Sequence, residues 1–174
     1  LIGFATRQSI VLEFAPTFIS IIMAGKMGSF ITSSIGTMRV TEQIDALEIM
    51  GVNSLTYLVL PKITAAMVFF PILIIFSMGL SLIGGWLSLL MSGLSSTDSY
   101  IFGLRSFFKF SDITYALSKT VVFGFLIVSV SSFYGYYVKG GSINVGQAST
   151  QAVVSSSVAI LVANLILTQL LLLS

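Results

Sequence analysis

The feature that most constrains this chain is the length of its stretches without a charged residue. Between Lys62 and Asp98 lie 35 uncharged residues, between Lys119 and Lys139 lie 19, and the 35 residues after Lys139 carry no charge. A helix that crosses a bilayer needs about 20 mostly apolar residues. The runs are continuous rather than alternating, which argues against a transmembrane barrel. Together with an N-terminal stretch, they predict four membrane-spanning helices, at about 9–36, 63–93, 113–138 and 149–173.

Composition agrees with a membrane protein and excludes several other classes. Charged residues make up 8% of the 174 residues, whereas the share in soluble domains is about 25%. So few charges cannot cover a water-soluble globule or form the basic face of a nucleic-acid-binding protein. With no His and no Cys, the usual zinc sites, disulfides, thiol nucleophiles and imidazole acid–base pairs are excluded. We therefore expect an all-α, polytopic transmembrane bundle that forms a single domain over 1–174.

Three connections join the predicted spans. Residues 37–62 hold the highest density of charge, residues 94–112 form a loop with room for a short interfacial helix, and residues 139–148 form a glycine-rich turn. Lysine and arginine residues divide equally between the two sides that this arrangement creates. The positive-inside rule therefore gives no orientation from charge alone.

The first predicted span carries small residues at every fourth position, namely Ala24, Gly28, Thr32 and Gly36. Small side chains at this spacing let helix backbones approach closely within lipid. Two interpretations follow. This face packs against another helix of the same chain, or it lines a subunit interface or a substrate path.

The stretch AGKMGS, which begins at Ala24, contains the GK pair of a phosphate-binding loop. A Walker sequence also needs a Gly five positions before that pair and a Ser or Thr directly after it. Here these positions hold Ser20 and Met27. The sequence therefore predicts no ATP site in this segment.

The segment 38–52 predicts a short amphipathic helix between two spans. Its apolar positions follow the rhythm of one helix face, and Thr41 is expected to cap its start. Three acids at steps of three residues share a polar face: Glu42, Asp45 and Glu48. Without histidine, a metal or acid–base site is disfavoured. The helix is either a solvated surface element or a docking helix for a soluble partner.

Seven runs of sequence, spread over essentially the whole chain, form a recognisable set. They are EFAP, AGKMGS, GTMRVTEQIDALEIMGV, YLVLPK, KTVVFGF, YYVKGG and ASTQAVVSSS. This set resembles the MlaE permease family, the membrane subunits of ABC-type lipid transporters that work with MCE-domain proteins. The chain looks like the C-terminal two-thirds of such a permease, without an interfacial helix and the first span. The resemblance implies that the helix at 9–36 is the second span of the family fold.

The resemblance also implies an assembly. The family protein is a homodimer in the inner membrane, with an ATPase subunit under each half and an MCE assembly on the opposite side. Residues 38–51 match its coupling helix, which places 37–62 and 139–148 in the cytoplasm and 94–112 outside. ATP and magnesium would then be bound by the partner ATPase, and this chain would need no cofactor. The residues expected to transmit motion are Arg39, Glu42, Gln43, Asp45 and Glu48.

Glu13 and Lys119 are ionisable residues within predicted spans, where an unpaired charge costs about 2.5–3.5 kcal/mol. In the implied topology both lie toward the outer side, about 35 Å and about 29 Å from the cytoplasmic ends of their helices, so an ion pair is feasible. The family tends to carry Glu and Lys at these positions and often an Arg beside the Glu, where this chain has Leu12. We expect the pair to brace an outer gate or contact a lipid head group, unless both side chains only extend to the interface.

Aromatic residues gather at the ends of two predicted spans. One group, expected to form a belt at the membrane interface, is Phe133, Tyr134, Tyr136 and Tyr137. A second group, expected at the outer interface within reach of an acyl chain or the MCE partner, is Phe102, Phe107, Phe108 and Phe110.

These observations predict the permease subunit of an ATP-driven phospholipid transporter that performs no covalent chemistry itself. Its spans offer apolar walls with serine and threonine, which suit an amphiphilic substrate. The alternative is a membrane scaffold that recruits cytosolic proteins through residues 38–51 without transporting anything. An intramembrane lipid enzyme is disfavoured, because it would need a nucleophile and a base that a chain without His and Cys does not readily supply.

Overall fold

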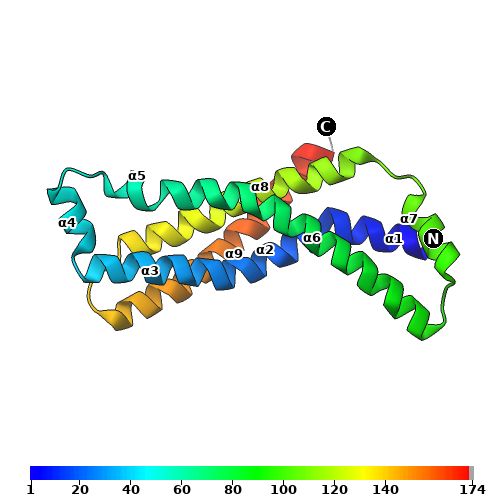
Figure 1. Cartoon of the computed structure of the whole chain (residues 1–174), viewed down its shortest axis with the longest axis horizontal. Coiled ribbons are helices and arrows are strands. Elements are labelled where there is room, and N and C mark those ends of the chain that lie inside the picture. Colours follow the sequence, from blue (N-terminus) through cyan, green and yellow to red (C-terminus); the bar gives the residue numbers. More distant parts are fainter. Residues whose placement is uncertain (173–174) are drawn as a thin grey trace.

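The computed structural model describes residues 1–172, and all the regular elements in that range are helices. Four helical stretches are long and apolar enough to cross a membrane: Ile2–Val40, Ser54–Ser92, Phe110–Tyr136 and Ser142–Leu172. Figure 1 shows these stretches running along the long axis of the molecule. The predicted all-α bundle with four spans is therefore confirmed. Each stretch begins before its predicted start, whereas the second and third end slightly before the predicted residues 93 and 138.

The first stretch is one continuous helix with two π-helical segments. Its parts are α1 (Ile2–Ser9), η1 (Ile10–Phe18), α2 (Ile19–Met23), η2 (Ala24–Gly28) and α3 (Ser29–Val40). Pro16 lies inside η1 and has no N–H to donate, so the regular α-helical ladder cannot pass through it. The predicted start at residue 9 was wrong, because the buried Arg7 is held by backbone carbonyls and the helix begins before it.

The other long helices also begin before their predicted starts at 63, 113 and 149. They are α6 (Leu60–Ser92), which follows the short α5 (Ser54–Leu58), α8 (Phe110–Tyr136) and α9 (Ser142–Leu172). Residues 142–148, predicted as a turn, are the first two turns of α9, because the connection needs only the residues around Gly140, whose φ is +107°. The predicted end of this span, residue 173, lies outside the described residues. The interfacial helix expected within 94–112 is α7 (Thr97–Arg105).

The helix predicted at 38–51 is shorter, because α4 covers only Gln43–Ile49. Residues 38–40 still belong to α3, and the chain breaks at Glu42, whose φ is +62°. The predicted cap was wrong: the Thr41 hydroxyl donates to the Thr37 carbonyl at 2.8 Å instead of closing the start of α4. The break turns α4 so that Ile44 becomes fully buried.

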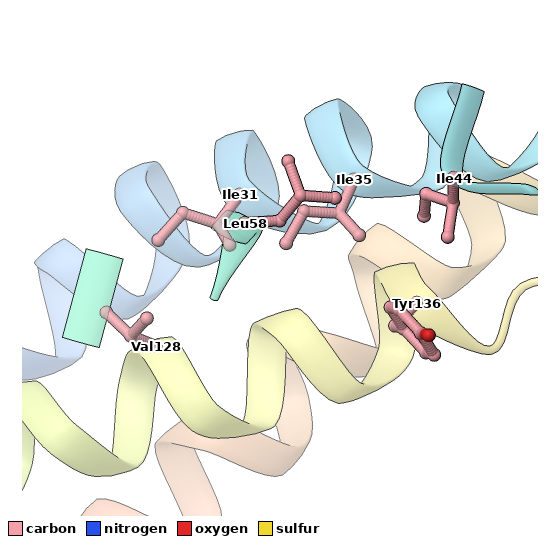
Figure 2. Packing of buried hydrophobic residues seen from close by; sticks show 6 residues of the cluster. All are labelled: Ile31, Ile35, Ile44, Leu58, Val128 and Tyr136. Carbon is pink, nitrogen blue, oxygen red and sulfur yellow. The ribbon is translucent and has the colours of Figure 1, made fainter. Parts of the chain in front are cut away.

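The two ends of the bundle differ. α4 and the α8–α9 connection lie at one end, which we call the α4 end, and α1 and α7 lie at the other, the α7 end (Figure 1). At the α4 end, an apolar cluster joins four helices (Figure 2): Ile31, Ile35, Ile44, Leu58, Val128 and Tyr136. Ile44 is the fully buried member from α4, and Leu47 of the same helix packs against the cluster, so apolar burial helps to anchor this short helix to the spans.

Candidate functional site

At the α4 end, Arg39 joins three elements. Its Nη1 forms an ion pair with Asp45 Oδ1 at 3.0 Å, and its Nε donates to the backbone carbonyl of Tyr136 at 2.9 Å. The guanidinium carbon lies 4.7 Å from the centre of the Tyr136 ring. One planar cation thus ties the end of α3 to α4 and to the last turn of α8.

Glu48 forms a second connection between α4 and α8. Its Oε1 accepts hydrogen bonds from the Ser54 hydroxyl and the Tyr136 hydroxyl, each at 3.0 Å, and these two hydroxyls are 2.8 Å apart. Ser54 and Tyr136 are buried, at 2% and 8% exposure. The hydrogen bonds from Ser54 and Tyr136 lower the pKa of Glu48 below its ordinary value of 4.5. At neutral pH the carboxylate therefore remains charged and able to accept both bonds.

The three-residue spacing suggested an acidic face of α4 without contacts to the rest of the chain. The structure shows that this face does make such contacts. Asp45 and Glu48 bond within the chain, whereas Glu42 and Gln43 are exposed. At the far end of the helix Ile49 and Met50 are 87% and 69% exposed. The surface of α4 that remains for another molecule combines two polar residues with an apolar tip.

Toward the α7 half of the bundle, Lys119 forms the centre of a polar cluster. Its side chain is fully buried, and its Nζ lies 3.1 Å from Glu13 Oε1 and 3.1 Å from the Tyr115 hydroxyl. It also donates to the Leu12 carbonyl at 3.3 Å and to Thr168 Oγ1 at 3.4 Å. Residues from η1, α8 and α9 thus converge on one ammonium group, as a buried lysine requires.

Glu13 is the partly exposed member of the ion pair at the centre of this cluster. Its side chain is 41% exposed, and its Oε2 accepts from Asn164 Nδ2 at 3.1 Å and from the Thr17 hydroxyl at 3.4 Å. Oδ1 of Asn164 is buried and has no hydrogen-bond partner within the described part of the chain. The cluster therefore presents a carboxylate at its surface with a cation directly behind it.

With both sites described, similarity to known proteins becomes informative. The model of the MlaE permease family matches residues 1–170. The chain belongs to this family. Proteins named as probable ABC transporter permeases are similar to it in Rickettsia bellii (37% identity over 93% of this chain) and in Synechocystis (35% over 97%). The Arabidopsis thaliana protein named trigalactosyldiacylglycerol 1, chloroplastic, is 36% identical over 89% of this chain.

The match leaves part of each relative uncovered. This MlaE-family chain spans 62% of the Rickettsia bellii protein, 64% of the Synechocystis protein and 44% of the Arabidopsis thaliana protein. The four helical stretches and the family membership together identify a multi-pass membrane protein.

In this MlaE-family fold, the small residues of the first span face helices of the same chain. Ala24, Gly28, Thr32 and Gly36 are all buried. A Cβ on Gly28 would lie 3.0 Å from Ser131 Oγ of α8, and one on Gly36 would lie 3.1 Å from Val145 of α9. The Thr32 hydroxyl donates to the Ser131 carbonyl at 2.8 Å. Of the two interpretations, the contact within one chain is the one that the structure shows.

Two residues of this permease matter more than the sequence indicated. Tyr136 was assigned to an interfacial belt, but it is buried and bonds to Glu48, whereas Phe133 and Tyr137 of the same group are exposed. Arg7 is absent from the residues predicted from sequence, although it is the one charged side chain among the first twelve residues. It is 5% exposed and donates to the carbonyls of Leu104, Ser106 and Phe107, which fastens the end of α7 to α1.

Proposed function

We propose that this chain is the membrane subunit of an ABC-type phospholipid transporter driven by a separate ATPase subunit. The observation that carries the proposal is the construction of α4. This short helix lies beyond the spans, is fixed to α3 and α8 by charged hydrogen bonds from Arg39 to Asp45 and from Tyr136 to Glu48, and leaves Ile49 and Met50 exposed. An exposed apolar tip on a rigidly held helix fits a protein partner that pushes on it.

The other family features belong to the same proposal. The working unit is a homodimer in the inner membrane, with the ATPase under α4, ATP and magnesium bound in that subunit, and an MCE-domain protein at the α7 end. The α7 end suits a hydrophobic neighbour, because exposed aromatic side chains gather there: Phe102, Phe107, Phe108 and Phe110. In this orientation α4 lies in the cytoplasm.

A phospholipid substrate fits the polar cluster and the surfaces of the spans. The cluster offers a half-exposed carboxylate backed by a buried ammonium group, which matches the mixed charges of a lipid head group. An apolar groove of about 310 Å³ between η2–α3 and α6 provides a wall for acyl chains, lined among others by Met27, Phe30 and Phe69. The name of the Arabidopsis thaliana relative, which contains a galactolipid, supports a lipid substrate class.

The deciding experiment uses the full-length protein that contains this chain. It is co-purified with its ATPase subunit in lipid nanodiscs, and ATP-dependent transfer of fluorescent phospholipid is measured together with native mass spectrometry of bound lipid. A transporter shows ATP-dependent transfer and lipid-stimulated hydrolysis. A scaffold that only recruits cytosolic proteins through α4 would bind the ATPase but give neither signal, and that result would overturn the proposal.

A further inference from the structure

We infer that Tyr136 is a positioning residue that makes α8 the rod through which movement of α4 reaches the Glu13–Lys119 pair. The inference rests on the proposed role of α4 as the helix that a motor subunit moves. Its observational basis is separate: the bonds of α4, the uninterrupted course of α8 and the place of Lys119 on that helix.

The short helix α4 is held in place by its neighbours in the chain and by side-chain bonds. It is attached to α3 and α5 through the chain itself, and to α8 through side chains, namely the Glu48 carboxylate on the Tyr136 hydroxyl. Arg39, on the Tyr136 carbonyl and on Asp45, strengthens the same junction. Figure 2 shows Tyr136 on α8 near the ends of α3 and α4 that carry Ile35 and Ile44, and the three residues belong to one apolar cluster. Any displacement of α4 therefore moves the last turn of α8 or breaks these bonds.

The first helix, α6 and α8 run from the α4 end toward the other end of the bundle (Figure 1). The first helix is interrupted by η2 (Ala24–Gly28) before it reaches Glu13, and α6 contains Pro71. Both features are places where helices bend. By contrast, α8 runs from Phe110 to Tyr136 as one α-helix with no proline. Of these three helical stretches, only α8 has neither a π-helical segment nor a proline, so we take it as the most rigid connection.

The residue of α8 that takes part in the polar cluster is Lys119. Lys119 lies 17 residues before Tyr136, which is about 26 Å along the helix axis. Its ammonium group bonds to Glu13 and to the Leu12 carbonyl, both in η1, where Pro16 already interrupts the regular ladder. A shift of α8 relative to η1 lengthens these contacts directly. We therefore expect two states. In the observed one, Lys119 is paired with Glu13; in the other, α4 has moved and Lys119 is displaced from Glu13.

The test compares Tyr136→Phe with Tyr137→Phe, the same chemical change at the next residue. Tyr137 is 57% exposed, and its ring packs on Phe133 and Tyr136. In the full-length protein in nanodiscs, hydrogen–deuterium exchange is followed in η1. We expect Tyr136→Phe to speed exchange at residues 10–18 at least fivefold, the lower end of typical allosteric coupling, and Tyr137→Phe to leave it unchanged. A purely local role of the hydroxyl would change exchange only in α4 and the end of α8, and that result would overturn the inference.

A second measurement uses the assembled transporter. Effects of residues more than about 10 Å apart normally add. We expect Tyr136→Phe and Lys119→Met to reduce lipid transfer non-additively, with the double variant no slower than the worse single variant, because both interrupt one connection. Strict additivity would contradict the inference. If the unmodified assembly transfers no lipid, the proposed function fails, whereas the exchange measurement in η1 still decides whether α8 connects the two sites.

Discussion

Lys119 donates a hydrogen bond to the backbone carbonyl of Leu12, at a distance of 3.3 Å. Pro16, four residues further along the helix, has no N–H for that oxygen. The break in the helix and the buried cation therefore meet at one carbonyl: the proline removes its α-helical donor, and the lysine supplies a donor from another helix. This relationship explains how an ammonium group is kept fully buried between spans.

Replacing this cation is the direct test of the polar cluster. Lys119→Met keeps the length of the side chain but removes its charge, while Glu13 retains its bonds to Asn164 and Thr17 and its partial exposure. If the chain works in the proposed phospholipid transporter, we expect the variant to stay folded and lipid transfer to fall about tenfold, equivalent to about 1.4 kcal/mol in the barrier. Size-exclusion chromatography and the nanodisc transfer assay measure the two properties. Lys26→Met, at an exposed position, is the matched control. Unchanged transfer by Lys119→Met would remove the cluster from the mechanism.

The number of spans was predictable from sequence because a run without charge leaves few alternatives to a membrane helix. Their ends were not, because a helix continues past the apolar region wherever its polar residues find partners. Arg7 and Arg39 are examples: both lie outside the predicted span, yet each bonds to carbonyls of another element and stays helical.

The face of α4 shows a second limit of periodicity. A spacing of three residues placed Glu42, Asp45 and Glu48 on one side, but it said nothing about the positive φ of Glu42 or about Tyr136 approaching from α8. Tyr136 and Tyr137 are neighbours of the same type, and only tertiary packing separates a buried positioning residue from an exposed ring. Such distinctions depend on contacts between residues far apart in the chain.

The close contact between α3 and α8 makes a prediction for Gly135. A Cβ at this position would lie 2.7 Å from the backbone carbonyl oxygen of Thr32, a distance that backbone atoms cannot relieve by a rotamer change. Gly135→Ala should therefore destabilise the protein by about 1–3 kcal/mol, as overpacking does in well-packed interiors. Thermal unfolding in detergent, monitored by circular dichroism, measures the change.

The control for this prediction is Gly146→Ala in α9. Within the described residues, apart from the neighbouring backbone of α9 itself, no heavy atom lies within 4 Å of a Cβ built on Gly146. Alanine favours the helix by up to about 1 kcal/mol relative to glycine. We expect this variant to be neutral or slightly more stable. Equal melting temperatures for the two variants would show that α3 and α8 are not packed as closely as described.

The Glu48 junction predicts a dependence on pH. Because hydrogen bonds from Ser54 and Tyr136 lower the pKa of Glu48 in the folded protein, its stabilising contribution is present above pH 4.5 and is lost as the pH falls through the lowered value. Hydrogen–deuterium exchange in α4 should be slow at pH 7 and, after correction for intrinsic rates, faster at acidic pH. Glu48→Gln should remove this dependence. A wild-type profile that stays flat into the acidic range would argue against the junction.

The last prediction concerns the opposite end, where Arg7 holds α7. Its guanidinium donates to three carbonyls at the end of α7 and lies over the rings of Phe4 and Phe108, 5.3 Å and 5.7 Å from their centres. Hydrogen bonds to a charged group contribute about 1.5–3 kcal/mol. Arg7→Met should therefore release α7 and increase protease cleavage between residues 105 and 110, whereas Arg105→Met, at an exposed position, should not. Because α1 and α7 lie at the opposite end of the bundle from α4 (Figure 1), binding of the proposed ATPase subunit to α4 should remain intact in Arg7→Met. Loss of ATPase binding in Arg7→Met would instead indicate general unfolding.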